Sequence, residues 1–250
     1  MKTIKMEEMN WPDIKSALQK GYTKVIVGVG SMEQHGPHLP TITDTLIGDA
    51  LAQRVALKLG NTLQAKTICV GCSEHHLAFP GTISIKTDTL KRIMDDYTES
   101  LVHHGFRHII YLPSHGGNFS TVAEAVKQQQ HKYPDHKIIA YTDLLGFIDW
   151  FYEISQEFGI TKEEAGAHAG ENETSVIMVL NRDLVQTERF KAGYLGPLGE
   201  EELKTIINQG MPALSESGVL GDPTKATPEK GEVYLEKMAD YLTFWIKKNL

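Results

Sequence analysis

The chain has 250 residues, 41% of them hydrophobic and 23% charged, with a formal net charge of −7 at pH 7. This composition is typical of a soluble globular protein, and a negative balance without a basic run excludes nucleic acid as a main partner. A chain of this length can bury about three quarters of its unfolded surface, so we expect one domain over residues 1–250. The N-terminal stretch lacks the apolar core of a signal peptide, and the longest apolar run, around residues 25–32, is too short to span a bilayer. We therefore expect a cytoplasmic protein without membrane contact.

Helix-length segments alternate with short apolar runs along most of the chain. Apolar residues at helical spacing, ended by glycines or polar turns, predict helices over residues 10–20, 46–59, 88–104, 119–132, 143–158 and 231–248. The apolar runs predict strands over residues 25–29, 68–70, 107–112 and 138–141. Continuously apolar strands separated by helices indicate a parallel sheet that is covered on both faces. We therefore predict the α/β class, as a three-layer α/β/α sandwich with a mainly parallel central sheet and an ordered, loop-rich segment from 183 to about 230.

Ionisable residues follow the first predicted strand. Glu33 and His35 are two residues apart, so in an extended segment they project to the same face. Asp44 comes nine residues later, just ahead of a helical pattern, which brings two carboxylates and an imidazole to one strand end. The alternative is that Glu33 and His35 are solvated loop residues and that Asp44, with Thr45, caps the helix.

A histidine also follows the third predicted strand. His115 is succeeded by Gly116 and Gly117, which remove side chains around the imidazole, and Asn118 can cap the next helix. Because the carboxyl ends of parallel strands meet at one edge of a sheet, His115 is expected near the first group. Taken alone, this stretch favours a simple turn.

The sequence GAHAGENETS, residues 166–175, leads into the apolar run VIMVL. Small residues leave His168 exposed, while Glu171 and Glu173 fall in the first turn of a helix, a placement worth about 0.3–1 kcal/mol without any metal. Glu173 shares a face with Ile177 and Leu180, which predicts that its carboxylate is buried. A buried carboxylate needs a compensating charge, which a metal ion supplies.

Together these segments supply three carboxylates and two imidazoles, from Glu33, His35, Asp44, His115 and Glu173. This set suffices for two divalent ions that share one bridging carboxylate, and mixed nitrogen and oxygen ligands suit zinc, manganese or iron better than calcium. Two such ions hold a hydroxide at neutral pH and polarise a carbonyl oxygen. His168 is then free for proton transfer.

Five stretches carry a resemblance to a known family. They are GSMEQHGPHLP with Asp44, FPGTIS at 79–84, SHGGN at 114–118, HAGENETS at 168–175 and GVLGDPTKATPEKGE at 218–232. In these the chain resembles the creatininase family of metal-dependent amidohydrolases. The resemblance implies a single α/β/α domain with a dinuclear metal centre, in which metal-bound hydroxide cleaves a C–N bond, other than a peptide bond, of a small cyclic or linear amide. It also implies a homohexamer built as a trimer of dimers.

The resemblance assigns roles by motif position. Glu33 and His115 would hold one metal, and His35 and Glu173 the other, with Asp44 bridging. His168 matches the catalytic histidine, and we expect Glu171 to orient it. The expected substrate contacts are Ser73, Gly116, Gly117 and Asn118.

One departure bears on the substrate. Creatinine-hydrolysing members carry a tyrosine and a glutamate directly after the histidine that here is His115, whereas this chain has Gly116 and Gly117. The glutamate adds a metal ligand and the tyrosine touches substrate, so we do not expect creatinine specificity. The glycines resemble a branch with formamide-cleaving and peptide-cleaving members.

Other readings of the sequence stay open. The same metal centre would also activate water against a lactone or a cyclic ketone. A non-catalytic nucleotide-binding module is a third alternative, because GVGSME at 28–33 half-resembles a dinucleotide turn, although the third glycine is missing and Glu33 would repel a pyrophosphate.

Several remaining histidines and cysteines are of residue types that often have functional roles. His38, His75 and His76 lie in loops at the same sheet edge, either beside the metal ligands or as ordinary polar loop residues. Cys69 and Cys72 form a C-x-x-C pair without a second pair to complete a zinc site, so we expect buried, inert thiols.

Overall fold

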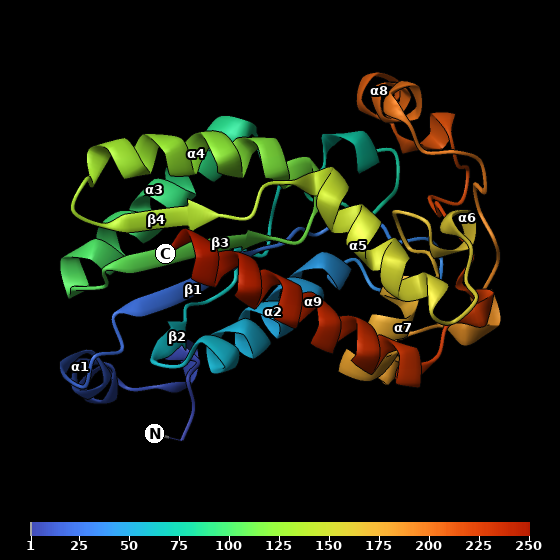
Figure 1. The fold of residues 1–250 in the computed structure, drawn as a ribbon. Coiled ribbons are helices and arrows are strands. Elements are labelled where there is room, and N and C mark those ends of the chain that lie inside the picture. Colours follow the sequence, from blue (N-terminus) through green and yellow to red (C-terminus); the bar gives the residue numbers. More distant parts are fainter. Residues whose placement is uncertain (1) are drawn as a thin grey trace.

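A parallel sheet forms the centre of the molecule. The computed structural model describes residues 2–250, and its four strands lie in the order β2-β1-β3-β4 (Figure 1). Every pair of neighbouring strands is parallel. The strands are β1 (Lys24–Val29), β2 (Thr62–Gln64), β3 (His108–Pro113) and β4 (Lys137–Ala140).

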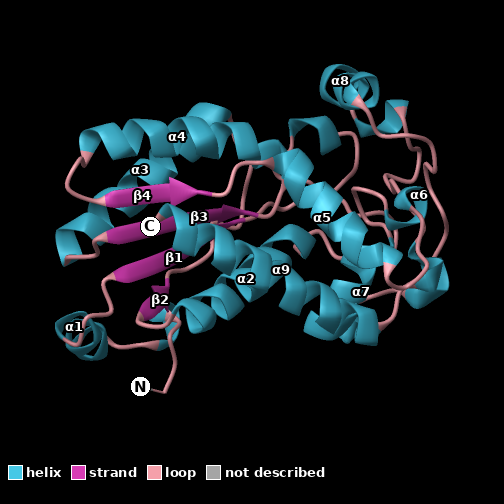
Figure 2. Ribbon diagram, in the orientation of Figure 1, coloured by secondary structure: helices cyan, strands magenta, loops and turns pink. Residues whose placement is uncertain are grey.

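Helices cover both faces of this sheet, which confirms the three-layer α/β/α prediction (Figure 2). One layer contains α2 (Thr43–Leu59), α5 (Leu144–Gln156), α7 (Glu171–Leu180) and α9 (Pro228–Asn249). The other contains α1 (Trp11–Gln19), α3 (Thr87–His104) and α4 (Phe119–Lys132). Two short helices, α6 (Lys162–Ala165) and α8 (Glu200–Gln209), lie in the loop-rich part.

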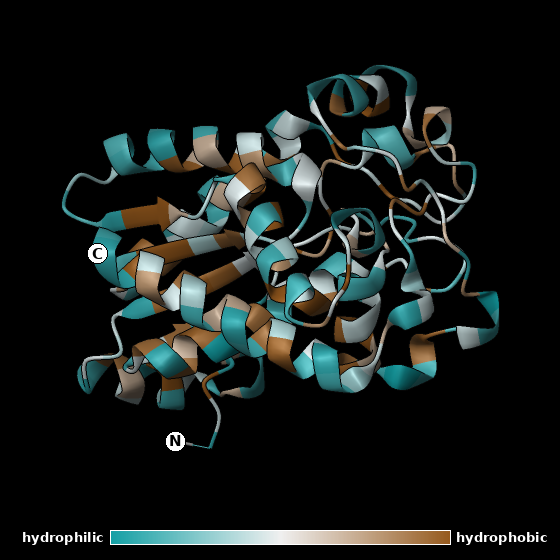
Figure 3. Ribbon diagram, turned by 45° about the vertical axis from the view of Figure 1, so that its right-hand side comes forward, coloured by the Kyte–Doolittle hydropathy of each residue, from teal (hydrophilic) through white to brown (hydrophobic). Residues whose placement is uncertain are grey.

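Side chains of each central strand alternate between two hydrophobic cores. Ile26 and Ile110 pack into the core under α2 and α9, whereas Val25, Val27 and Ile109 pack under α3 and α4. All five are fully buried, and the strands are hydrophobic along their length in Figure 3. A strand that is buried on both faces has no polar side, which explains the continuous apolar runs in the sequence.

The second strand lies earlier in the chain than the sequence predicted. Residues 68–70 form only an isolated bridge, Ile68 to Val29, and the strand is Thr62–Gln64. The apolar signal missed β2 because Thr62 and Gln64 are polar, yet both are buried, and the Thr62 hydroxyl donates to the carbonyl of Gly60 at 2.8 Å. The Gln64 amide donates to the backbone and carboxylate oxygens of Asp49 at 3.0 and 2.9 Å.

The expectation of two buried thiols was also wrong. Cys69 is exposed and Cys72 is half-buried, because the chain leaves the sheet after Ile68 instead of continuing as a buried strand.

The predicted helices are all present, with boundaries shifted by at most a few residues. Figure 1 shows α6, α7 and α8 beyond the carboxyl ends of the strands, where the loops after β1 and β3 also lie. This edge is where open parallel sheets place their binding sites. Within residues 2–250, no helix is long and apolar enough to cross a membrane.

Candidate active site

The predicted metal ligands come from four places in the fold. Glu33 and His35 follow β1, Asp44 lies in the first turn of α2, His115 follows β3, and Glu173 lies in the first turn of α7. A glycine brings the first two elements together. A Cβ atom at Gly30 would lie 2.6 Å from Cα of Thr45, so only glycine lets the start of α2 approach the end of β1 this closely.

All five side chains meet around Asp44. Its Oδ2 lies 3.2 Å from Nδ1 of His115, which in turn lies 3.2 Å from Oε1 of Glu33. Its Oδ1 lies 3.2 Å from Nε2 of His35, and Oε2 of Glu173 is 4.0 Å from that same nitrogen. The two oxygens of Asp44 therefore face two different groups, each with one imidazole and one further carboxylate.

Electrostatics at this cluster favour added positive charge. Burial alone would raise the pKa of Glu33 and Asp44, but the facing imidazoles lower that of Glu33 to about 2 and hold that of Asp44 well below its usual value. Burial opposes protonation of His35, yet the charge of Asp44 raises its pKa to about 9, and Glu33 likewise raises that of His115. Burial raises the pKa of Glu173 to about 7. Closely packed carboxylates thus hold protons on the neighbouring imidazoles.

Backbone carbonyls fix which nitrogen of each ligand histidine faces the cluster. Nε2 of His115 donates to the carbonyl of Cys72 at 3.1 Å, and Nδ1 of His35 donates to the carbonyl of Glu33 at 3.2 Å. Because the outer nitrogen donates to a carbonyl in each ring, the inner one is the nitrogen that can release its proton and bind a metal. Gly117 makes room for the first bond, since a Cβ there would lie 2.4 Å from the Cys72 oxygen.

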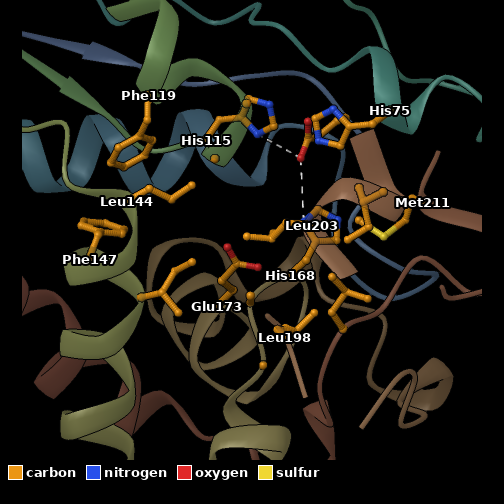
Figure 4. Close-up of a pocket in the computed structure, with 18 of the residues that line it drawn as sticks. His75, His115, Phe119, Leu144, Phe147, His168, Glu173, Leu198, Leu203 and Met211 are labelled. Atoms are coloured by element: carbon orange, nitrogen blue, oxygen red, sulfur yellow. Dashed lines mark ion pairs between the residues drawn. The ribbon is translucent and has the colours of Figure 1, made fainter. Parts of the chain in front are cut away.

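His168 lies beside the cluster and is buried, which corrects the expectation that the small residues around it leave it exposed. One of its nitrogens is already hydrogen-bonded. Its Nε2 donates to the carbonyl of Gln34 at 2.7 Å, so Nδ1 is the free nitrogen, 3.8 Å from Oε1 of Glu33. Burial and then the neighbouring His35 hold the pKa of His168 well below its usual value. The structure thus places a neutral imidazole with an open lone pair next to the predicted metal ligands. Figure 4 shows His168 beside Glu173.

Two residues of this site were not singled out as site residues by the sequence, Gln34 and His76. The Gln34 amide donates to Nδ1 of His76 at 2.8 Å and accepts from the backbone N–H of Gly36. His76 then turns Nε2 toward Oε1 of Glu33 at 3.4 Å. Gln34 lies between two ligands in the sequence, which is the only signal that pointed to it.

The other two histidines have different positions. His75 lines the cavity, and its ring stacks on that of His115 with centroids 5.7 Å apart. Nε2 of His38 bonds the Thr174 hydroxyl at 2.9 Å, and its ring packs against Phe190. His38 is therefore a buried structural residue.

Glu171 does not orient His168, which corrects the prediction. Its carboxylate accepts hydrogen bonds from Ser175 at 2.8 Å and from Tyr234 at 2.6 Å, so it faces α9. Two residues apart in a helix, Glu171 and Glu173 point in different directions, and only Glu173 reaches the cluster around Asp44.

The predicted substrate contacts divide into two pairs. Gly116 and Gly117 line the cavity. The side chains of Ser73 and Asn118 are instead buried among the loops. The Asn118 amide donates to the carbonyl of Gly30 and accepts from the N–H of Cys72, both at 2.9 Å. The Ser73 hydroxyl lies 3.4 Å from Nε2 of His115. Asn118 also makes no side-chain cap for α4. Its role in this structure is to tie three loops together.

The glycines after β1 do not form a nucleotide cradle. A Cβ at Gly28 would lie 2.9 Å from the side chain of Thr67 and 3.2 Å from the carbonyl of Gly48, and Gly30 packs against Thr45. Both glycines serve the packing of α2 on the sheet, which argues against the dinucleotide alternative.

A cavity of about 250 Å³ opens beside the cluster. Its polar end is formed by metal-ligand candidates and histidines, among them Glu33, His115, His168 and Glu173. Its other walls are apolar and come from α5 and from the segment around α8.

The donor set fits divalent transition metals. The second oxygen of Glu33, Oε2, is buried and lacks a hydrogen-bond partner among the described residues. Ligand atoms of Glu33, His35 and Asp44 lie within 4.8 Å of one another, as do those of His35, His168 and Glu173. Buried imidazoles and carboxylates in this mixture are the ligands of zinc, manganese and iron sites.

Fold and site together define an α/β protein with a buried carboxylate and imidazole cluster at the carboxyl ends of its strands. The family model described as creatininase, creatinine amidohydrolase, matches residues 7–246. The chain therefore belongs to the creatininase family.

Individual relatives span most of the chain. The mycofactocin precursor peptide peptidase of Mycolicibacterium smegmatis is 34% identical over 229 residues, 90% of this chain and 84% of that protein. The 3-dehydro-scyllo-inosose hydrolase of Thermotoga maritima is 31% identical over 242 residues, 87% of this chain and 75% of that protein. A crystal structure of a creatinine amidohydrolase (creatininase) has the same fold, with a TM-score of 0.84 at 24% identity, covering 99% of this chain and 98% of that one.

Proposed function

We propose that this chain is a metal-dependent hydrolase that cleaves the C–N bond of a small cyclic or linear amide with two divalent ions. The observation that carries the proposal is the position of Asp44, whose two oxygens lie 3.2 Å from two different histidines. A carboxylate between two imidazole and carboxylate groups is the arrangement that a shared, bridging ligand requires.

The five ligand candidates then fall into two sites. Glu33 and His115 would hold one ion and His35 and Glu173 the other, with Asp44 common to both. Zinc, manganese or iron bound there would polarise a carbonyl group and lower the pKa of water to near neutrality.

His168 is the proton-transfer group of this proposal. Its bond to the Gln34 carbonyl holds the ring with Nδ1 free, and the lowered pKa keeps that nitrogen unprotonated at neutral pH. Nδ1 can accept the proton that the attacking water loses and deliver it to the leaving nitrogen, a transfer worth about 10²–10⁴ in rate.

The relatives support an amide bond as the target. One is named as a peptide peptidase, and peptide bonds are amides. Creatinine itself is not the proposed substrate, because Gly116 and Gly117 provide neither the extra ligand nor the tyrosine of creatinine-hydrolysing members.

A second candidate function is hydrolysis of a C–C bond in a cyclic ketone. The Thermotoga maritima relative is named as a hydrolase of 3-dehydro-scyllo-inosose, a cyclic polyhydroxy ketone. The apolar wall of the cavity in this chain favours the amide, because a polyhydroxylated ring would leave its hydroxyl groups without partners there.

Metal content, measured by elemental analysis of chelator-free protein, tests the centre. We expect close to two equivalents of zinc, manganese or iron, with a sharp loss in Asp44→Ala. The control is Asp88→Ala, because Asp88 occupies the same place in α3 as Asp44 in α2, within the same sequence TDTL, but is exposed. The proposal would be excluded if the protein contained no metal even after incubation with all three ions, or if both variants lost metal equally.

The reaction is tested with the loaded protein on a panel of cyclic amides, formamides, dipeptides and cyclic 1,3-diketones. Release of an amine from any amide supports the C–N assignment. Turnover of the diketones alone would replace it with the second candidate.

A further inference from the structure

The cavity beside the cluster has two chemically different ends. Its polar end holds the metal-ligand candidates and His168, and its other side is lined by aromatic and branched aliphatic side chains. In Figure 4, Phe119, Leu144 and Phe147 lie on one side of His168 and Glu173, Met211 lies on the other, and Leu198 lies below them.

Helix α5 supplies the aromatic part of this wall because it is apolar on more than one face. Phe151 and Ile154 are buried in the core toward Tyr234 of α9, while Leu144 and Phe147 are only half-buried and line the cavity. Phe147 is held between Phe119 and Phe151, with ring centroids at 5.8 and 5.3 Å. An apolar face held rigidly beside a reaction centre, but not covered by the protein itself, is available to a ligand.

The α8 segment supplies the opposite part of the wall. Ile206 is buried and packs with Met211 and Leu220, which attaches the helix to the loops around the site. Leu203, one turn earlier on the same face, is half-buried and lines the cavity.

Charge around the cavity restricts what can bind against these walls. Among the described residues that line it, none is lysine or arginine, and the acidic ones are Glu33 and Glu173. An anionic group on the substrate would find no partner away from the metal ligands, and burying it there unpaired is costly.

The size of the cavity agrees with one medium-sized apolar group. A protein cavity of about 150 Å³ holds a benzene ring. The roughly 250 Å³ here leaves room for one ring or branched chain together with an amide group at the polar end.

We infer that the substrate carries an uncharged aromatic or branched aliphatic group next to the carbonyl that is attacked, and that Phe147 and Leu203 select this group. The inference rests on the proposed function and names the substrate class of the same site. A small polar ring such as creatinine would leave these walls without contact, whereas an amide with an apolar acyl group would bury its side chain on them.

Binding of hydroxamic acids to the zinc-loaded protein, measured by titration calorimetry, tests this without turnover. Acetohydroxamate, phenylacetohydroxamate and succinyl monohydroxamate share one metal-binding head and differ only in the tail. Burial of a phenyl group should make phenylacetohydroxamate bind about 10–100-fold more tightly than acetohydroxamate. The succinyl compound, with an anionic tail, should bind no more tightly than acetohydroxamate.

Variants of the apolar cavity wall test whether its side chains cause the preference for the phenyl compound. The phenyl preference is the ratio of the affinities for phenylacetohydroxamate and acetohydroxamate. We expect Phe147→Ala and Leu203→Ala each to lower this ratio at least five-fold, on the order of the effect of losing several buried methylene groups. Both should keep the affinity for acetohydroxamate, which also reports that they fold. Leu145→Ala is the matched control, because Leu145 lies on α5 next to Leu144 but is 62% exposed.

The outcomes separate the two claims. If none of the three hydroxamates binds the loaded protein, the metal centre fails, and the substrate class fails with it. If acetohydroxamate binds but the phenyl compound binds no more tightly, or if the succinyl compound binds best, the metal centre stands and the apolar substrate class is overturned. An unchanged phenyl preference in both wall variants also overturns it.

Discussion

The backbone carbonyl of Gln34 lies 2.7 Å from Nε2 of His168, and this one bond determines which nitrogen of His168 faces the metal ligands. A carbonyl oxygen only accepts, so Nε2 must carry the proton and Nδ1 must carry the lone pair. Gln34 also lies between Glu33 and His35 in sequence, so the segment that supplies two of the proposed metal ligands also orients the proposed proton-transfer group.

Replacing His168 by alanine should therefore abolish proton transfer without removing the metals. We expect turnover to fall by about 10²–10⁴, the range of a general acid or base. Metal content should stay at the wild-type value, because the five proposed ligands remain. Turnover close to wild type, with full metal content, would remove His168 from the mechanism.

Adjacent glycines in the loop after β3 should respond differently to alanine. A Cβ at Gly117 would lie 2.4 Å from the carbonyl oxygen of Cys72 and 2.5 Å from Nε2 of His115, whereas at Gly116 its nearest neighbours are the Leu144 methyls at 3.9 and 4.0 Å. Gly117→Ala must displace the His115 ring or break its bond to Cys72. Such changes beside a ligand typically cost about 10–100-fold in metal affinity.

Gly116→Ala is the matched control and should keep wild-type affinity for zinc, measured by competition with a chelating dye. Equal affinities in the two variants would show that the bond between His115 and Cys72 does not matter for metal binding.

The sequence predicted which side chains form the buried cluster better than it predicted the contacts that support them. Glu33, His35, Asp44 and His115 were predictable because loops after parallel strands meet at one edge. The face that Glu173 shares with Ile177 indicated that residue, although its side chain is 19% exposed and not fully buried as predicted. Glu171 was assigned wrongly, because its contact with Tyr234 depends on how α7 and α9 pack. Strand β2 was missed for a similar reason, since Gln64 is buried only through its bonds to Asp49, a contact from another element.

Tyrosines two turns apart on α9 test whether Glu171 has a structural role. The Tyr234 hydroxyl donates to the buried Glu171 carboxylate at 2.6 Å, whereas the Tyr241 hydroxyl bonds that of Tyr141 at 2.9 Å. Hydrogen bonds to charged groups contribute about 1.5–3 kcal/mol and neutral ones about 0.5–1.5 kcal/mol. Tyr234→Phe should therefore lower the free energy of unfolding more than Tyr241→Phe, with metal content unchanged in both.

Denaturant unfolding of the two phenylalanine variants gives this comparison directly. Equal losses of unfolding free energy would mean that the hydrogen bond from Tyr234 to Glu171 stabilises the fold no more than the one between Tyr241 and Tyr141. Loss of metal from Tyr234→Phe would instead connect Glu171 to the site.

Metal binding should become tighter as the pH rises. In the metal-free chain the charge of Asp44 overcomes burial and raises the pKa of His35 to about 9 from its ordinary 6.5, and Glu33 and Asp44 raise that of His115. A folded-state pKa above the unfolded one stabilises the metal-free fold fully below pH 6.5, and this stabilisation is lost as the pH passes through 9. The same proton competes with the metal for Nε2 of His35, so at neutral pH each imidazole must release a proton on binding.

Titration calorimetry in two buffers of different ionisation enthalpy counts these protons. At pH 7.5 we expect about two protons to be released when both sites fill, one from each imidazole. The apparent metal affinity should therefore rise between pH 7 and 9 and level off as His35 loses its proton. His35→Ala should release about one proton fewer and bind fewer ions. Binding heats that do not depend on the buffer would mean that both imidazoles are already neutral, and that the carboxylates around Asp44 do not hold the charge that this structure assigns to them.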